Sequence, residues 1–491
     1  NFINGKKSLS KSNKFDNVFD PSTGEIKSEV NLSNYDDLEY CIKAAKKSQI
    51  EWSEITPLKR SRILQKYKLI LEENIDELAK LVSSEHGKTI EDAKGSVTRG
   101  IEVVEFASGI PHLIKGEFSQ NVGTDIDSWS IRQPLGICAG ITPFNFPAMV
   151  PMWMYPIAIA CGNSFILKPS EKDPSCPMKL AELFSEAGLP DGIFNVINGN
   201  KDLVNHLLSH NDISSISFVG STNVAKYIYE QGGKYHKRVQ ALGGAKNHLV
   251  VMPDADLDQA VDGIIGAGYG SAGERCMAVS AVVAVGDISN ELVKKIADKA
   301  EKINVGPWTD NNSNMGPLIS EDHKKKVINY IETGIDEGAD LILDGRNLKL
   351  QGYENGFFVG PTLFDNVNKN MTIYKDEIFG PVLSVLRVPN YDNAVELIND
   401  HQYGNGTSIY TSSGDIARHF SSNIKIGMVG INVPIPVPMA FHTFGGWKNS
   451  LFGSSGMHGI EGMNFYSKQK TVTSRWPSTI KRGSEFKIPT N

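Results

Sequence analysis

The feature that most constrains the fold is a series of short apolar segments that alternate with segments of helical pattern from about Gly136 onward. The apolar segments read GICAGI, SFILK, IFNVI, SSISFV and HLVVM, and an intervening segment such as CPMKLAELFSEAG has proline near its start and glycine at its end. Buried strands joined by helices form a parallel sheet covered on both faces, and ligands bind beyond the carboxyl ends of its strands. The sequence therefore predicts an α/β fold with a nucleotide-binding layer from about 140 to 247.

The rest of the chain also carries patterns typical of helices and strands. Residues 35–110 carry apolar side chains at helical spacing, with a helix start signal at Thr56-Pro57. A second α/β stretch runs from about 248 to 453, with VSAVVAVG and GPVLSVLRV as strands and ELVKKIADKAEKI and DNAVELIND as helices. The segment NVPIPVPMA, residues 432–440, has proline at alternate positions and is predicted to be an extended loop. A chain of 491 residues exceeds what one core supports, so more than one domain is expected.

Composition excludes several partners. The 50 Lys and Arg stand against 56 Asp and Glu, a net charge of −6, and no dense basic segment offers a site for nucleic acid or an anionic membrane. The five cysteines are odd in number and form no CxxC pair, which predicts a reducing, cytoplasmic location. Residues 146–162 are almost long enough for a membrane span, but Pro147, Pro151 and Pro156 favour a buried helix, so no membrane association is predicted.

A cysteine follows two glycines in GSAGERCMA, residues 270–278. A lone cysteine is more often a small buried hydrophobic residue than a nucleophile. Here Gly270 and Gly273 permit close backbone approach, and Arg275 places positive charge beside Cys276, where a thiolate would attack a carbonyl carbon. This context favours a nucleophile.

Further motifs offer polar groups near predicted strand ends. Asn145 in TPFNFP has side-chain N–H groups suited to stabilising an oxyanion, although a turn asparagine would look the same. Lys168 in ILKPSE follows the next strand, FVGSTNVAKY opens a helix, and EIFGP precedes a strand. His206 and His210 have the spacing of a ligand pair but lack a third ligand, so no metal site is predicted. The absence of a GxSxG motif argues against a serine hydrolase.

Taken together, TPFNFP, LKPSE, FVGST, LGGAKN, GERC and EIFGP, in this order over about 4–476, resemble the aldehyde dehydrogenase superfamily. The resemblance implies an aldehyde dehydrogenase-like α/β fold with a variant Rossmann NAD-binding domain, an α/β catalytic domain and a β-hairpin arm for forming homodimers or homotetramers. The expected ranges are 1–120 and 140–247 for NAD binding, 248–453 for catalysis, and 121–139 with 454–491 for the arm and C-terminal tail.

The resemblance also implies roles for individual residues. Cys276 matches the nucleophile, and Asn145 matches the amide that stabilises the oxyanion together with the backbone N–H of Cys276. The implied contacts to the NAD cofactor come from nine residues, of which Lys168 and Glu171 match ribose contacts, Ser221 a pyrophosphate contact, and Glu377 and Phe379 nicotinamide-ribose contacts. The nine are Thr142, Phe144, Lys168, Glu171, Lys172, Ser221, Gly243, Glu377 and Phe379.

One departure narrows the expected reaction. Hydrolytic members of the superfamily carry a glutamate at the start of the LGG motif, but this chain has Ala241, which cannot activate water. A thiol, with a pKa of about 8.5 against about 15.7 for water, needs far less help from a base, so coenzyme A is the predicted co-substrate. The segments GAKNH, GYENGFFVGPT and NVPIPVP are similar to the CoA-acylating branch that oxidises malonate and methylmalonate semialdehyde. Arg275 and Arg99 match that branch's carboxylate-binding arginines.

Two other interpretations remain open at this point. One is a hydrolytic aldehyde dehydrogenase whose base lies elsewhere, and the other is a non-catalytic protein that keeps the fold. Turnover without coenzyme A would favour the first. The absence of a reactive thiol and of NAD binding would favour the second.

Overall fold

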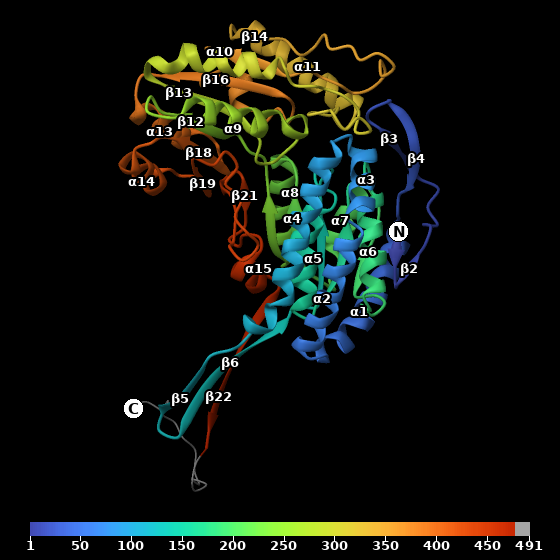
Figure 1. The fold of residues 1–491 in the computed structure, drawn as a ribbon. Coiled ribbons are helices and arrows are strands. Elements are labelled where there is room, and N and C mark those ends of the chain that lie inside the picture. Colours follow the sequence, from blue (N-terminus) through green and yellow to red (C-terminus); the bar gives the residue numbers. More distant parts are fainter. Residues whose placement is uncertain (477–491) are drawn as a thin grey trace.

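Two large sheets and a projecting three-stranded arm make up the protein (Figure 1). The structure is a computed structural model, and it describes residues 1–476 of the 491-residue chain. Both large sheets are mainly parallel and have helices packed on them, which confirms the predicted α/β class.

The first sheet has eight strands, and its central strands β9, β8, β7, β10 and β11 run parallel. In spatial order the strands are β2 (Lys6–Lys7), β1 (Phe2–Ile3), β9 (Phe194–Val196), β8 (Ser164–Lys168), β7 (Ile137–Ile141), β10 (Ile213–Val219), β11 (Arg238–Leu242) and β21 (Leu451–Phe452). Strands β7, β8 and β9 are buried along their whole length. Burial on both faces explains why the sequences of these strands are nearly continuous apolar runs.

Helices cover this sheet on both faces, and the helical pattern predicted for residues 35–110 is confirmed by the first four of them. The helices are α1 (Tyr35–Glu54), α2 (Pro57–Glu73), α3 (Ile75–His86), α4 (Ile90–Ser108), η1 (Ile110–His112), α5 (Met149–Ala160), α6 (Ser175–Glu186), α7 (Lys201–Ser209) and α8 (Thr222–Lys234). Helix α4 packs against α2, α3 and α5. Lys88, just before α4, donates to the carbonyl oxygen of Asn145 at 2.6 Å, so the start of α4 lies close to the turn that precedes α5.

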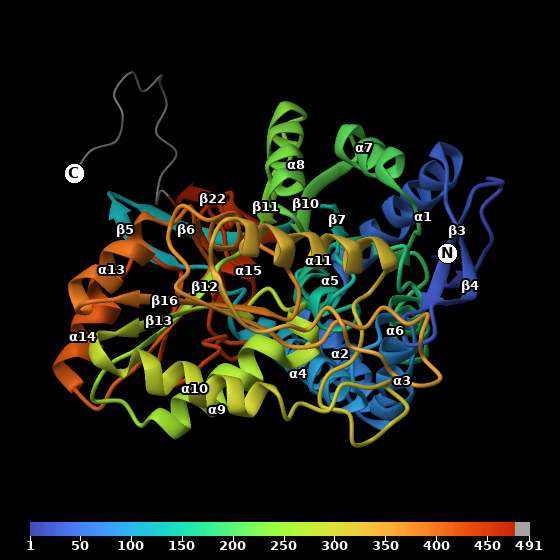
Figure 2. The same ribbon diagram turned by 90° about the horizontal axis from the view of Figure 1, so that it is seen from above.

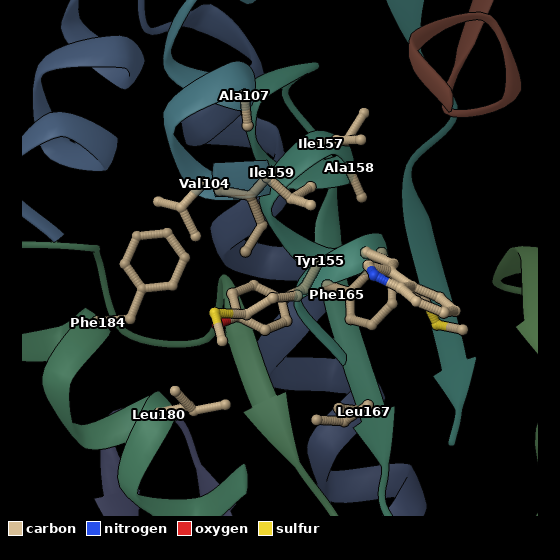
Figure 3. Packing of buried hydrophobic residues seen from close by; sticks show 14 of the residues in the cluster. Val104, Ala107, Tyr155, Ile157, Ala158, Ile159, Phe165, Leu167, Leu180 and Phe184 are labelled. Atoms are coloured by element: carbon tan, nitrogen blue, oxygen red, sulfur yellow. The ribbon is translucent and has the colours of Figure 1, made fainter. Parts of the chain in front are cut away.

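Helix α5 is the apolar segment that could be mistaken for a membrane span. All its residues from Val150 to Ala160 are buried, and Figure 3 shows Tyr155 packed among the side chains of Phe165, Leu180 and Phe184. The ring of Tyr155 stacks on Phe194, with 4.2 Å between centroids. The predicted buried helix is confirmed, and among residues 1–476 no helix is long and apolar enough to cross a membrane.

The second sheet has seven strands, all parallel to their neighbours except the edge strand β14. In spatial order they are β14 (Asp340–Leu343), β15 (Thr362–Asp365), β16 (Val382–Val388), β13 (Val279–Val285), β12 (Asn247–Val251), β18 (Gly406–Tyr410) and β19 (Met428–Ile431). The strands predicted at VSAVVAVG and GPVLSVLRV are thereby confirmed as β13 and β16.

The helices of this second unit lie on both sides of its sheet (Figures 1 and 2). They are α9 (Leu257–Tyr269), η2 (Gly270–Gly273), η3 (Gly286–Ile288), α10 (Ser289–Ala300), α11 (Glu321–Asp336), α12 (Thr372–Lys375), α13 (Tyr391–Asp400) and α14 (Gly414–Asn423). One core forms under α9, α10 and α11, and another forms under α13 and α14.

The arm is an antiparallel sheet in the order β22 (Ser467–Arg475), β6 (Ile126–Pro134) and β5 (Phe118–Gly123), and it extends away from the body (Figure 1). Helix α15 (Gly459–Phe465) leads into β22. Two small two-stranded sheets complete the fold, the hairpin of β3 (Phe15–Asp20) with β4 (Glu25–Asn31) and the pair of β17 (Tyr403–Gly404) with β20 (Trp447–Lys448). Residues 432–440, predicted as an extended loop, form no helix or strand.

The observed sheets differ from the predicted ranges at two places. The arm begins at Phe118 rather than 121, and β7 of the first sheet begins at Ile137, inside the range 121–139 assigned to the arm. Strand β21, inside the range 248–453, pairs with β11 of the first sheet. A polar strand such as β5 and a two-residue strand such as β21 carry no periodicity that a sequence could reveal. Residues 477–491 of the predicted tail lie outside the described residues.

Candidate active site

Cys276 follows a turn of unusual backbone conformation. After α9 ends, Ser271, Ala272 and Gly273 have φ values of 53°, 52° and 73°. A Cβ on Gly273 would lie 2.2 Å from the carbonyl oxygen of Gly380, so the turn packs directly against the segment after Phe379. Left-handed residues other than glycine persist only where the surrounding structure imposes them, and such residues cluster at functional sites.

The side chain of Asn145 lies beside the Cys276 sulfur. Its Nδ2 donates to the carbonyl oxygen of Glu274 at 3.0 Å and lies 3.4 Å from Cys276 Sγ. Asn145 is fully buried, and the carbonyl of the next residue, Phe146, accepts a bond from Val150 in α5. The buried helix α5 thus fixes the turn that holds Asn145. The amide N–H can donate to an oxyanion formed on a carbonyl carbon that is bonded to the sulfur.

Two further amides anchor the backbone of Cys276. The Nδ2 atoms of Asn247 and Asn405 donate to its carbonyl oxygen at 2.9 and 3.1 Å. The other four cysteines are buried, whereas Cys276 is partly exposed. Burial raises the pKa of the Cys276 thiol to about 11, and the hydrogen bond from Asn145 opposes this shift in part. The thiol is therefore neutral at pH 7 in this state of the site.

A cluster of buried ionisable side chains, to which the sequence assigned no role, lies behind the cysteine turn. Glu274 accepts a bond from the backbone N–H of Ile319 at 3.2 Å, and its carboxyl oxygens lie 3.7 and 3.6 Å from the Nε2 atoms of His86 and His323. Lys88 is buried and donates to the backbone carbonyl of Asn145 at 2.6 Å. Burial raises the pKa of Glu274 to about 8 and lowers that of Lys88 to about 8.

The residues expected to contact a cofactor follow the carboxyl ends of neighbouring strands of the first sheet. Thr142 follows β7, Lys168 ends β8, Ser221 comes two residues after β10, and Gly243 follows β11. Because these strands are parallel neighbours, their carboxyl ends lie at one edge of the sheet, where ligands bind in folds of this kind.

This edge of the sheet carries unused hydrogen-bonding groups. The buried hydroxyl of Thr142 has no hydrogen-bond partner among the described residues. Ser221 caps α8 without a side-chain bond to the helix, so N–H groups of the first turn can bind an anion. Lys168 Nζ lies 2.7 Å from a carboxyl oxygen of Glu171, and Lys172 Nζ donates to Ser320 Oγ at 3.3 Å.

Glu377 and Phe379 come to this edge from the second unit. Glu377 accepts a bond from the backbone N–H of Ala245 at 3.0 Å, and burial raises its pKa to about 7. Phe379 has a φ of 60°, and its ring meets the edge of Phe144 at 5.9 Å between centroids. Glu377, Phe379, Arg275 and Cys276 all line one small cavity, whose walls come from residues 245–280 and 377–382.

A glycine next to this cavity leaves room that a side chain would fill. A Cβ on Gly244 would lie 2.6 Å from Glu377 Oε2 and 2.7 Å from Thr222 Oγ1. The glycine, the uncapped helix start and the unpartnered Thr142 hydroxyl fit a dinucleotide that lies along the strand ends and reaches Glu377.

The two arginines are held differently. Arg275 Nη2 bonds to Asp92 on α4, and the guanidinium lies over Gly270. Arg99, also on α4, bonds to Glu102 at 2.6 Å and to the carbonyl of Pro438 at 2.7 Å. The structure thus places Arg275 at the Cys276 cavity and Arg99 against the proline-containing loop.

Histidines away from the site have ordinary partners. His210 lies 2.9 Å from a carboxyl oxygen of Glu39, and the ring of His206 packs on Tyr35. Within residues 1–476, no group of three His, Cys, Asp or Glu side chains is arranged to hold a metal ion.

Comparison with known proteins shows the family to which the chain belongs. The sequence pattern of the aldehyde dehydrogenase family matches residues 9–472. The chain is 53% identical over 474 residues to a malonate-semialdehyde dehydrogenase of Pseudomonas aeruginosa, covering 96% of this chain and 95% of the relative. It is 50% identical over 476 residues to a malonate-semialdehyde dehydrogenase of Halalkalibacterium halodurans, covering 97% and 98%.

Solved structures agree as well. A Sinorhizobium meliloti protein in complex with NAD, assigned as a methylmalonate-semialdehyde dehydrogenase, superposes with a TM-score of 0.97 at 54% identity, covering 98% of each chain. A methylmalonate-semialdehyde dehydrogenase from Oceanimonas doudoroffii gives a TM-score of 0.96 at 52% identity, covering 97% of this chain and 98% of that one. The chain therefore belongs to the aldehyde dehydrogenase family.

Proposed function

We propose that the protein oxidises malonate or methylmalonate semialdehyde with NAD and transfers the acyl group to coenzyme A, with loss of CO2. The observation that carries this proposal is the Cys276 site, where an amide donor lies 3.4 Å from the sulfur and an arginine lines the same cavity. The names of the relatives from P. aeruginosa and O. doudoroffii support the substrate class.

The chain's own residues supply the first step. The Cys276 thiol gives its proton to water, and the resulting thiolate adds to the aldehyde carbon. Asn145 Nδ2 and the backbone N–H of Cys276 then donate to the oxyanion that forms. Arg275 binds the substrate carboxylate, because a guanidinium matches a carboxylate in charge and shape. Arg99 on α4 is assigned to the same carboxylate.

A bound dinucleotide is held by the strand-end residues. The residues that would contact the dinucleotide along the first sheet are Thr142, Lys168, Glu171, Lys172, Ser221 and Gly243. The residues that would contact it nearer to Cys276 are Phe144, Glu377 and Phe379. NAD, when bound, accepts the hydride that leaves the thiohemiacetal carbon, and the product on the enzyme is a thioester of Cys276.

Loss of CO2 follows from the position of the substrate carboxylate. It lies beta to the thioester carbonyl, so the electron pair of the breaking carbon–carbon bond is delocalised into that carbonyl and is then protonated. Coenzyme A attacks the remaining acetyl or propionyl thioester and releases the Cys276 thiolate. Ala241 is buried and offers no base for water, which favours the thiol acceptor.

The test is product analysis with the wild type and Cys276→Ala. Wild-type enzyme given malonate semialdehyde, NAD and coenzyme A should yield acetyl-CoA and CO2, and the variant should yield neither. Release of a free acid at the same rate without coenzyme A would overturn the acylating assignment and point to Glu377, near Cys276, as a base for water. Substantial NADH formation by Cys276→Ala would overturn the nucleophile.

We also assign the first sheet with its helices to NAD binding, the second sheet with its helices to catalysis, and the arm to assembly of a homodimer or homotetramer. Phe118 and Val122 on β5 are 65% and 51% exposed, and Trp476 after β22 is 66% exposed, which suits a surface covered by another copy. Light scattering of a Phe118→Ser, Val122→Ser variant should show a smaller assembly than the wild type. An unchanged mass would contradict the role of β5.

A further inference from the structure

We propose that Asp92 and Gly270 are positioning residues for Arg275 and that they set the preference for aldehydes that carry a carboxylate. This inference rests on the proposed function, because it takes Arg275 as the group that binds the substrate carboxylate. Asp92 lies outside the motifs that identified the site, and Gly270 stands in GSAGERCMA, where the sequence indicated only a close approach of the backbone. The structure adds the contact of both residues with the Arg275 guanidinium.

Asp92 holds the guanidinium from one side. Its Oδ1 accepts from Arg275 Nη2, and both side chains are about one-fifth exposed. Asp92 is itself fixed, because it stands in the first turn of α4, where its backbone N–H donates to the capping Thr89 hydroxyl at 3.3 Å. Arg275 Nη1 lies 3.4 Å from the carbonyl of Gly266 in α9. The ion pair therefore ties Arg275 to helix α4 across the boundary between the two units.

Gly270 makes room for the guanidinium on the other side. A Cβ at this position would lie 2.6 Å from Arg275 Nη1 and 2.7 Å from both Cζ and Nη2. The backbone itself does not require glycine, because Gly270 has a φ of −54° and a ψ of 137°, which any residue adopts. The absence of a side chain at Gly270 thus serves the placement of Arg275.

Charge balance gives Asp92 a second role. Buried Lys88 lies near both Asp92 and Arg275, and Asp92 favours the charged form of Lys88 whereas Arg275 opposes it. Asp92 therefore offsets the repulsion between the two cations. Without it, the guanidinium would move away from Lys88 and leave its present place over Gly270.

The placement of Arg275 affects only substrates that carry a carboxylate. A guanidinium has five N–H donors, so Arg275 retains donors for a carboxylate while Asp92 and Gly266 hold it. Alignment of these donors matters for an aldehyde with a carboxylate. It does not matter for propanal, which reacts with Cys276 and Asn145 in the same way but offers nothing to Arg275.

The experiment compares Asp92→Asn and Gly270→Ala with the wild type, using malonate semialdehyde and propanal. The first variant removes the charge with little change of shape, and the second displaces the guanidinium without a change of charge. Each should lower kcat/KM for the semialdehyde about tenfold, mainly through KM, as is typical when a supporting hydrogen-bond partner is lost, and should change kcat/KM for propanal less than twofold. Glu91→Gln, an exposed neighbour on the same helical turn, is the control and should change neither value.

A second readout needs no turnover. Malonate should protect Cys276 from alkylation by iodoacetamide, and half-protection should require more malonate in both variants than in the wild type or Glu91→Gln. Equal losses for the two aldehydes, or an unchanged or improved kcat/KM for the semialdehyde, would overturn the positioning role.

Arg275→Leu separates this inference from the proposed function. If that variant affects both aldehydes equally, Arg275 does not bind the carboxylate and the proposed function loses its basis for substrate choice. If Arg275→Leu is selective but Asp92→Asn and Gly270→Ala are not, the present inference alone is wrong.

Discussion

Replacing Asn145 with alanine tests the oxyanion site at Cys276. The substitution removes both bonds made by Nδ2, the one to the Glu274 carbonyl and the 3.4 Å contact with the cysteine sulfur. It leaves intact the bond from Lys88 to the backbone carbonyl of residue 145, because that acceptor belongs to the main chain. The loss is therefore confined to one donor beside the reacting atoms.

The expected size of the effect follows from the loss of that donor. Removal of one oxyanion-hole donor lowers kcat by about 10²–10³, which corresponds to about 2.7–4 kcal/mol of transition-state stabilisation. Asn145 is fully buried, so water cannot readily supply a replacement donor. We expect the rate of the first NADH burst to fall by this factor, with less than a threefold change in the affinity for NAD.

The assay is stopped-flow detection of NADH in single-turnover conditions with saturating semialdehyde. Asn145→Asp is the companion variant, because it keeps the shape but replaces the donor with an acceptor and adds negative charge beside the thiol. It should be at least as slow as the alanine variant. A fall of less than tenfold in Asn145→Ala, with an unchanged Tm, would refute the role assigned to the amide.

Three further predictions concern pH and packing. Because burial raises the pKa of Cys276 to about 11, the rate of its alkylation by iodoacetamide in the free enzyme should keep rising with pH through pH 9, and a plateau below pH 8 would contradict this. Burial raises the pKa of Glu274 to about 8, so the folded state loses stability as the pH rises from the unfolded pKa near 4.5 toward 8. The Tm of Glu274→Gln relative to that of the wild type should therefore increase between these pH values and level off above pH 8. A difference in Tm that does not depend on pH would contradict the assignment. Phe184 is fully buried and stacks on Tyr67 with 4.0 Å between ring centroids, so Phe184→Ala should cost about 3–5 kcal/mol in the free energy of unfolding measured with urea, and a loss below 1 kcal/mol would show that the core closes over the gap.

The sequence predicted the parts of the fold that have a clear pattern of apolar residues. The buried strands β7, β8 and β10 are apolar runs between helices, and α5 is apolar on every side, so their patterns indicated a covered parallel sheet and a buried helix. Strand β21 could not be predicted, because it is two residues long and pairs with β11, which precedes it by about two hundred residues. The start of β5 was not predicted either, because this edge strand is largely polar and has no alternation of apolar and polar residues.

The residues of the site likewise differ in whether the sequence could predict them. Cys276 and Asn145 stand in motifs whose residue types suggest their chemistry, and the structure brings them together. Asp92 and Lys88 are single charged residues in segments that are otherwise ordinary, and Glu274 stands in the GERC motif without a role that the motif suggests. Only the folded chain shows that these residues lie close to the cysteine turn. The role of Gly270 depends on a side chain that lies over it, which no local pattern reveals.

The measurement that tests the central claim most directly is NADH formation from malonate semialdehyde with purified enzyme, with and without coenzyme A. The account predicts a single burst of about one NADH per active site without coenzyme A and steady turnover when it is added, because the Cys276 thioester waits for a thiol. Equal steady turnover in both conditions would contradict the account, since water would then be the acceptor despite Ala241.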